Sequence, residues 1–393
     1  MIGNEMRKIW KQHTLILVVV VGVTLMYSWV IGQMNLERLP LFETVELEIG
    51  KQLQEKYGNE LDAKELEEIE VLYEEAKRDL NQKVAEKYPE IIGGQYKNFE
   101  EFEYDCCSTE EGSQDQLEDE AMWETYSHMV EEFNWEYETC ITYDSIRNVF
   151  KANKAIIPWI EEYDNKVFVE RIYEIINRNT ASTLPSQVTM NMRYVLINYS
   201  WLLCILAMII VLPYLTNDNR RNVYPVMAAT KTGRRLIGYQ IMASLLSVCM
   251  MLGVCDVVFY ICYRVMTPYE SFNHCRVDWL WFDWTWQQYF WIQLLMINIG
   301  VLSLSMIFLF VSSLCKNIVG FVVGASMCWG IGSVLSIYYF SQLFHCGYLV
   351  NSYMDMKTRW PYMDVVIEVI MFLTGIVLLG TLYRRRMKAD IMG

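Results

Sequence analysis

Thr14 to Gly32, TLILVVVVGVTLMYSWVIG, is an uncharged apolar run long enough to cross a bilayer as one helix. The segment that follows, residues 33–193, is polar and contains no such run. Five more apolar runs come after it, which makes six candidate spans: residues 14–32, 194–215, 237–263, 288–314, 317–342 and 362–383. This order predicts an all-α membrane protein with six transmembrane helices and a domain inserted between helices 1 and 2.

The inserted segment, residues 33–193, is called the polar domain below and carries the acidity of the chain. It holds 37 Asp and Glu against 16 Lys and Arg, a net charge of −21, whereas the remaining residues have 10 acids and 17 bases, a net charge of +7. Together they give the net charge of −14. An acidic chain is unsuited to nucleic acid, which needs a basic surface. We therefore expect no nucleic-acid partner.

Basic residues set the expected orientation, because Lys and Arg collect in short cytoplasmic segments. They precede span 1, lie between spans 2 and 3, and follow span 6: Arg7, Lys8, Lys11, Arg220, Arg221, Lys231, Arg234, Arg235, Arg384, Arg385, Arg386 and Lys388. Lys316 alone lies between spans 4 and 5, and the loops of the other face hold only Arg264, Arg276, Lys357 and Arg359. We expect a multi-pass cell-membrane protein with both termini cytoplasmic, a basic tail at 384–393, and residues 33–193 extracellular.

The first apolar run is longer than the core of a secretory signal, and no small-x-small cleavage pattern follows it. We interpret it as an uncleaved anchor.

The spacing of apolar residues predicts that the polar domain is mainly helical. Six of them recur three or four positions apart, as on one face of a helix: Leu66, Ile69, Tyr73, Ala76, Leu80 and Val84. Pro89 and the Gly93-Gly94 turn end this helix. Further helices are expected over about 114–140 and 153–178. The acidic stretch 100–119 is poor in apolar residues and is expected to form a loop.

Four tryptophans lie in the loop 264–287: Trp279, Trp281, Trp284 and Trp286. Two interpretations stay open, a belt at the membrane interface and a surface on which a ligand stacks.

The cysteines show no CxxC pair and no Cys/His cluster at zinc spacing, so no metal site is expected. Three of them lie in the polar domain, Cys106, Cys107 and Cys140. In an oxidising compartment, a disulfide from Cys140 to one of the adjacent pair is a candidate.

Motifs of an enzyme are absent from the sequence. It has no GxxxxGK[ST], GxSxG or HExxH pattern, and its four His are far apart. The longest expected cytoplasmic segment, residues 216–236, is too short for a catalytic domain. We expect no catalytic residue and no cofactor in this chain.

The cytoplasmic loop 216–236 has its own pattern. Pro225 is placed to begin a turn or two of helix over Val226 and Met227, and residues 230–235 are expected to turn the chain back into span 3. Such a short helix suits docking to a cytoplasmic partner. An ordinary basic loop is the alternative.

Residues 1–13 contain a second amphipathic stretch, Glu5 to Lys11. Met6, Ile9 and Trp10 share one face, while Arg7, Lys8 and Lys11 lie on others, as in an interfacial helix.

These two segments and the order of spans resemble the permease subunits of ABC transporters of the type-2 exporter class. The resemblance implies an amphipathic elbow helix, represented by Glu5, Arg7, Lys8 and Trp10, ahead of span 1. It also implies a coupling helix between spans 2 and 3 that contacts the ATPase through Tyr224, Pro225, Val226, Met227, Thr230, Gly233, Arg234 and Arg235. Asn222 to Pro225 depart from the acidic-x-x-x-Gly opening that is usual in the family.

By the same resemblance, the protein would dimerise in the lipid membrane as a homodimer or heterodimer. It would pair with a separately encoded cytoplasmic ATPase that binds ATP and Mg²⁺, and it would export a hydrophobic or peptide-like substrate.

Ionisable residues within spans are costly to bury and are candidates for function. Asp256 and Arg264 lie eight residues apart on one face of span 3, and Asp364 and Glu368 lie one turn apart in span 6. They are candidates for an outer gate, with interfacial snorkelling and helix pairing as the alternative. In span 5, Gly320-x-x-x-Gly324 favours close helix contact and fits a dimer interface.

A second function stays open. In that hypothesis the chain is a membrane sensor or immunity protein, whose acidic external domain binds a cationic antimicrobial peptide without transport. A secondary transporter is disfavoured, because no inverted repeat is visible.

Overall fold

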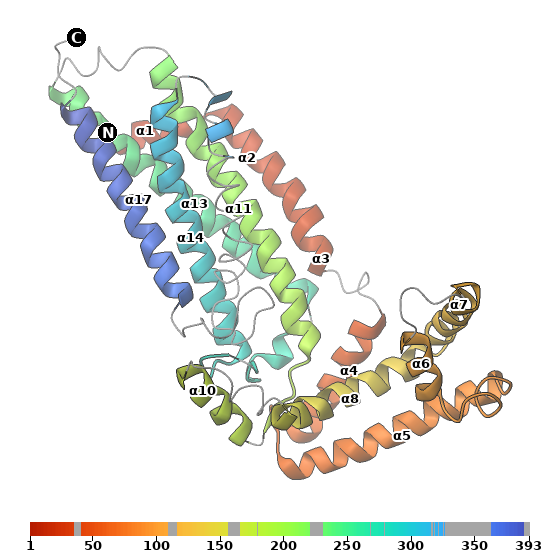
Figure 1. Cartoon of the computed structure of the whole chain (residues 1–393). Coiled ribbons are helices and arrows are strands. Elements are labelled where there is room, and N and C mark those ends of the chain that lie inside the picture. The colour runs from red at the N-terminus through yellow and green to blue at the C-terminus, as the bar shows by residue number, and fades with distance from the viewer. Residues whose placement is uncertain are drawn as a thin grey trace.

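The computed structural model describes residues 1–34, 41–108, 116–155, 166–178, 180–220, 231–267, 269–278, 280–315 and 363–388, with single positions between 317 and 326. Helices dominate these residues. The described residues form a bundle of long helices, with the polar domain at one end and α1 (Ile2–Ile9) together with the last residues of α17 (Met363–Lys388) at the other (Figure 1).

Five helical stretches are long and apolar enough to cross a membrane: Gln12–Ile31, Asn191–Val211, Arg235–Met266, Trp286–Leu314 and Val365–Met387. They correspond to five of the six predicted spans. Most of the remaining predicted span, 317–342, lies outside the described residues.

The helices that carry these spans are α2 (Gln12–Leu25), α11 (Ser186–Arg220), α13 (Lys231–Met266), α14 (Trp286–Leu314) and α17. A π-helical turn, Met26–Ile31, and the short α3 (Gly32–Met34) extend α2. Gly22 lies close to Leu206 of α11, so α2 approaches the bundle along this helix.

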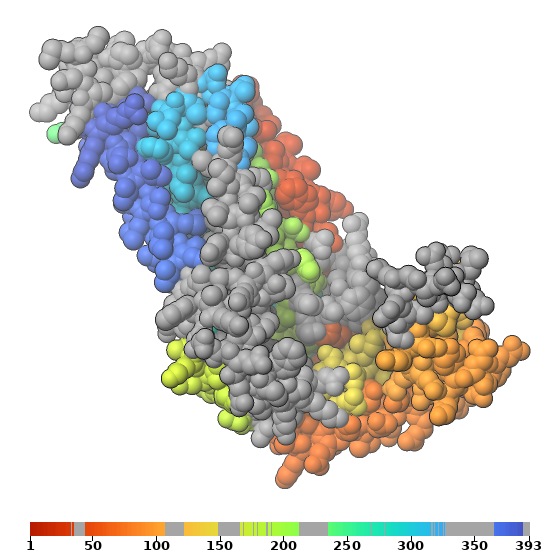
Figure 2. Space-filling model, in the orientation of Figure 1, coloured from red at the N-terminus to blue at the C-terminus, as the bar shows by residue number. Residues whose placement is uncertain are grey.

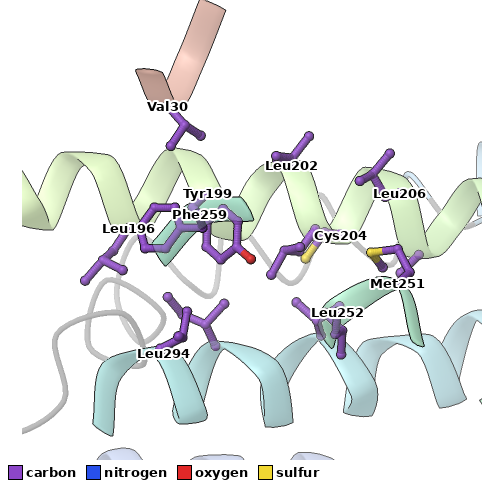
Figure 3. Close-up of a cluster of buried hydrophobic side chains, with 14 of the residues drawn as sticks. Val30, Leu196, Tyr199, Leu202, Cys204, Leu206, Met251, Leu252, Phe259 and Leu294 are labelled. Atoms are coloured by element: carbon purple, nitrogen blue, oxygen red, sulfur yellow. The ribbon is translucent and has the colours of Figure 1, made fainter. Parts of the chain in front are cut away.

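The bundle core is aromatic where α11, α13 and α14 meet. Phe259 of α13 stacks on Tyr199 of α11, with ring centroids 4.2 Å apart, and on Phe290 of α14, with centroids 6.1 Å apart. Figure 3 shows Tyr199 and Phe259 overlapping between the ribbons, with Leu196 and Leu294 beside them. Both rings are fully buried. Burial of such large apolar surfaces fixes the relative position of the three helices.

The polar domain is helical, as the apolar spacing predicts. It contains α4 (Leu41–Tyr57), α5 (Ala63–Lys87), α6 (Phe99–Ser108), α7 (Gln116–Glu132), α8 (Asn134–Ala155) and α10 (Lys166–Asn177). Its only described strands are two residues each, β1 (Glu60–Leu61) and β2 (Ala181–Ser182), which pair antiparallel.

Helix α5 matches the predicted helix. A capping box starts it, because the Asp62 carboxylate accepts the amides of Lys64 and Glu65 at 2.8 and 2.9 Å, while the Glu65 carboxylate accepts the Asp62 amide. Its last helical residue, Lys87, comes two residues before Pro89. Four of the six spaced apolar residues are buried: Ile69, Tyr73, Leu80 and Val84.

The expected loop 100–119 is wrong at both ends, because residues 99–108 form α6 and α7 begins at Gln116. Phe99, Phe102 and Cys106 are spaced by three and four residues and are all buried. Their apolar face joins a cluster with Leu80 and Val84 of α5 and with Tyr126 and Met129 of α7. Burial of this narrow face stabilises a helix whose other faces are acidic.

Helix α8 joins two apolar clusters of the polar domain. Tyr137 and Cys140 pack against the cluster built on α6, whereas Tyr143 and Ile146 pack against a second cluster on α4 and α5 that includes Val45 and Ile69. The polar domain therefore has cores of its own, separate from the core of the bundle.

Candidate functional site

The loop between α13 and α14 ties the polar domain to the bundle, and we call residues 269–285 the clasp. Its first part, the 3₁₀ turn Tyr269–Phe272, is buried against the bundle core. The Tyr269 hydroxyl accepts a hydrogen bond from Asn191 of α11 at 2.8 Å. On its other side, the carbonyl of Ser271 accepts the Gln54 amide of α4 at 2.6 Å. The clasp thus contacts both parts of the molecule.

Charge pairs join α10 to the end of the clasp. The Asp283 carboxylate accepts both terminal nitrogens of Arg178, at 2.6 and 2.8 Å, and one nitrogen of Arg171 at 2.7 Å. These guanidinium groups lower the pKa of Asp283 to about 2. A bidentate guanidinium–carboxylate pair fixes orientation as well as distance, so α10 is held in one position.

A second set of charges lies beside the β1–β2 pair. Arg276 reaches the Glu60 carboxylate at 3.3 Å and the Asp278 carboxylate at 3.3 Å. Asp278 also accepts the backbone amide of Ser182 at 3.1 Å. Burial raises the pKa of Asp278, and Arg276 opposes this rise.

A cavity of about 170 Å³ opens at this junction. Its walls come from α4, α8, β2 and the residues after it, the first turn of α11, and the clasp. They carry two carboxylates and several hydroxyls, including Glu46, Asp278, Thr142, Ser145 and Thr189. Such a cavity holds a few water molecules or one small polar group. A small ligand in this cavity would contact the polar domain and the bundle at the same time.

Two of the four tryptophans of the loop 264–287, Trp281 and Trp286, are buried. Trp281 packs within the structure, and Trp286, at the start of α14, donates its indole N–H to the Tyr263 hydroxyl at 3.0 Å. Phe282 and Trp284 stack on one another with centroids 4.7 Å apart. For Trp281 and Trp286 the structure therefore supports neither an interface belt nor a ligand-stacking surface. Trp279 lies outside the described residues.

Asp256 and Arg264, two residues of the predicted outer gate, have different partners. Asp256 accepts hydrogen bonds from the Tyr199 hydroxyl at 2.7 Å and from the Asn298 amide at 2.8 Å. Arg264 instead pairs with Glu270 of the clasp, at 2.8 Å between Nη2 and Oε2. The outer gate therefore stays a prediction: α11 and α14 supply the partners of Asp256, and the clasp supplies the partner of Arg264.

Glu368 of α17 is 3% exposed, and no hydrogen bond to its Oε2 is found in the described structure. Its Oε1 lies 2.9 Å from the position that a Cβ atom on Gly300 would take, so the glycine leaves room for the carboxylate. The side chain of Asp364 lies outside what the structure describes. Asn298 and Gly300 are two residues apart, so Asp256 and Glu368 approach α14 at one level from different helices.

The predicted elbow forms a helix, with different bounds. Helix α1 ends at Ile9, and an extended Lys11 separates it from α2. Ile9 is buried and Met6 is partly buried, whereas Arg7, Lys8 and Lys11 are exposed. Trp10 donates its indole N–H to Ser247 of α13 at 3.0 Å, and the buried Glu5 pairs with Lys8 at 2.7 Å. The sequence pattern did not predict that Glu5 is buried.

The ends of the predicted coupling loop 216–236 are helical. Helix α11 continues to Arg220, and α13 already begins at Lys231, so Gly233, Arg234 and Arg235 lie within its first turns. The expected turn over residues 230–235 is therefore wrong from Lys231 onward. Tyr224, Pro225, Val226, Met227 and Thr230 lie outside the described residues.

Cys106 and Cys140 belong to the same apolar cluster of the polar domain. Cys140 is a thiol, and burial raises its pKa to about 11. Cys140 does not form a disulfide in this structure, so the predicted disulfide stays a prediction. The side chain of Cys107 is outside the described set.

In the part of the chain that the structure describes, no group of three or more His, Cys, Asp or Glu is arranged to hold a metal ion. Comparisons with family models, curated proteins and solved structures find no match to this chain.

Proposed function

We propose that this chain is the membrane-spanning permease subunit of an ABC transporter, driven by a separately encoded ATPase that binds ATP and Mg²⁺. In this proposal both termini are cytoplasmic, the polar domain is extracellular, and two permease copies form the transporter. The substrate is a hydrophobic or peptide-like molecule that leaves the cell.

The observation that carries the proposal is the arrangement of the basic end of the bundle. Helix α1 lies against α13, through Ile9 and the Trp10–Ser247 hydrogen bond, and the first turns of α13 contain Arg234 and Arg235. This end lies opposite the polar domain (Figure 1). An ATPase that pushes on the start of α13 would move a long continuous helix whose far end enters the clasp at Tyr269.

Contact with the ATPase is tested by co-purification of the full chain from its native membrane. We expect an ATP-hydrolysing subunit to be recovered with the wild-type chain, and its yield to fall strongly in the double variant Arg234→Glu/Arg235→Glu. The matched control is Lys64→Glu/Arg78→Glu, two exposed bases of the polar domain at the other end. Recovery of the wild-type chain without any nucleotide-binding subunit, or equal recovery with both double variants, would refute the proposal.

A second candidate function is a sensor for cationic antimicrobial peptides that confers resistance without transport, in which the cavity at the clasp receives one cationic group of the peptide. The cavity contacts both parts of the molecule and contains two carboxylates, Glu46 and Asp278, beneath a domain of net charge −21. Vesicles that contain the chain and its ATPase separate the two functions. Movement of a labelled peptide across the vesicle membrane supports transport, and peptide binding without movement supports sensing.

A further inference from the structure

The ends of α14 and α17 away from the polar domain enclose a groove of about 560 Å³. Two guanidinium groups, Arg385 and Arg386, and two hydroxyl side chains, Ser313 and Thr381, lie on its walls, together with apolar side chains that include Phe310 and Leu314. None of the described residues that line it is acidic. The groove therefore combines positive charge, hydroxyl groups and apolar surface in one place.

The groove lies at the level where helices leave the apolar layer. The spans Trp286–Leu314 and Val365–Met387 both end at its walls. Leu314 is 52% exposed, and Tyr383, one residue from the groove-lining Leu382, is also exposed. Helix ends at this level meet lipid headgroups, and an exposed Tyr is typical of that interface.

One of the two arginines is held in place by the bundle. Arg386 is half-buried and donates Nη2 to the backbone carbonyl of Ser313 at 3.5 Å. Arg385 is exposed. The neighbouring Arg384 is exposed as well but does not line the groove, so the sequence supplies a base of the same type outside the site.

We propose that this groove binds the phosphate headgroup of an anionic phospholipid. A guanidinium group binds phosphate oxygens in bidentate geometry, and two of them oppose the charge of one phosphodiester. The apolar walls beside the arginines suit the glycerol and first methylenes of a lipid, whereas a free phosphate ion would leave them uncovered. The occupant is therefore a lipid and not a small soluble anion. The inference does not depend on the transport proposal, because it concerns the isolated chain.

Native mass spectrometry of the purified full chain tests the proposal with two added probes, phosphatidylglycerol and phosphatidylcholine. We expect the wild-type chain to retain phosphatidylglycerol in preference to phosphatidylcholine. Arg385→Gln/Arg386→Gln should weaken phosphatidylglycerol binding about tenfold or more, and Arg384→Gln should leave it unchanged. Arg385→Gln alone changes an exposed side chain and so provides a variant expected to fold normally, with a smaller loss.

Three results would overturn the proposal. Equal weakening by Arg384→Gln would mean that general positive charge at this end attracts lipid. Unchanged binding in the Arg385/Arg386 double variant would place the lipid elsewhere. Displacement of the lipid by millimolar inorganic phosphate would identify a site for small anions. A thermal unfolding curve of each variant, compared with that of the wild type, establishes that the fold is retained.

Discussion

Two carboxylates, one in the bundle and one in the polar domain, each accept two hydrogen bonds from other side chains. Asp256 accepts the Tyr199 hydroxyl and the Asn298 amide, and Glu103 of α6 accepts the hydroxyls of Tyr126 and Tyr137, both at 2.7 Å. The geometry is similar, but the surroundings differ. Around Asp256 the neighbouring surface is apolar and suited to lipid, whereas water reaches the rim of the polar domain.

The difference teaches where polar groups matter for stability. In the bundle, a donor that loses its acceptor has few substitutes, because lipid offers none. In the polar domain, water replaces a lost partner at small cost. Exposed surfaces follow the same division: most exposed large residues of α13 and α17 are aliphatic, such as Val257 and Ile370, while α5 exposes Glu and Lys. Figure 2 shows α17 in blue on the bundle and α5 in orange on the polar domain.

The largest expected effect is that of Phe259→Ala in the bundle. The change removes a fully buried ring that stacks on Tyr199 and Phe290, and it should lower the free energy of unfolding by about 3–5 kcal/mol. Thermal unfolding of the purified chain in detergent measures it. The matched control Val257→Ala lies two residues away with a 60% exposed side chain and should change stability little. Similar losses in both variants would mean that these helices do not pack as described.

The comparison of carboxylates is tested directly by Asp256→Ala and Glu103→Ala. We expect Asp256→Ala to cost about 2–4 kcal/mol, because two donors lose their acceptor among apolar helices. Glu103→Ala should cost about 1 kcal/mol, because the hydroxyls of Tyr126 and Tyr137, 2.9 Å apart, still bond one another and Tyr137 is only half-buried. The same unfolding assay gives both values. A larger loss for Glu103→Ala than for Asp256→Ala would reverse the comparison.

A smaller effect is expected where the two regions meet, and it depends on pH. The pKa of Asp283 is lowered to about 2 from its ordinary value of 3.8, so its contribution to stability is fully present above about pH 4 and is lost as the pH falls toward 2. The protection of the α10 amides against hydrogen exchange, relative to the intrinsic rate at each pH, should therefore fall in wild type over this range. In Asp283→Asn the exchange should be faster already at pH 7, and the step between pH 4 and 2 should be absent. If the step were unchanged in Asp283→Asn, an acidic residue other than Asp283 would be responsible for it.

The smallest effect is expected for an exposed charge pair on α5. Lys83 lies 2.8 Å from Asp79 and 2.7 Å from Glu136, and it is partly exposed. Asp79→Asn should change the free energy of unfolding by about 0.5 kcal/mol or less, because surface pairs contribute little. Chemical denaturation of the chain, followed by a signal from the polar domain, measures this change. A loss as large as that of Asp256→Ala would contradict the division between the two regions.

The sequence predicted the parts of the fold that depend on local spacing. The uncharged run 14–32 and the spaced residues from Leu66 to Val84 correspond to α2 and α5. The same rule, applied to Phe99, Phe102 and Cys106, would have found α6. The acidic composition around these residues concealed it, because a helix needs only a narrow apolar face to be stabilised by packing.

The candidate site was predictable only in part. Residues 256 and 264 share a face of one helix, yet the partner of each is decided by which helices lie alongside. Asn298 and Glu270, the observed partners, belong to other segments. The clasp depends on pairs more than 100 residues apart, such as Arg178 with Asp283, and no local pattern of charge indicates such a pair. The contact of Gly300 with Glu368 also joins two different helices, and no local pattern indicates it.

Helices α5, α6 and α7 of the polar domain reach sideways from the bundle, past α2 and α3 (Figure 1). Helix α5, with 25 residues, is about 37 Å long, comparable to the thickness of a bilayer. If the spans cross a bilayer with the polar domain at its surface, this arm would lie over the lipid next to α2. A neighbouring membrane protein would then come closer to the flank that carries α17 than to the flank that carries α2.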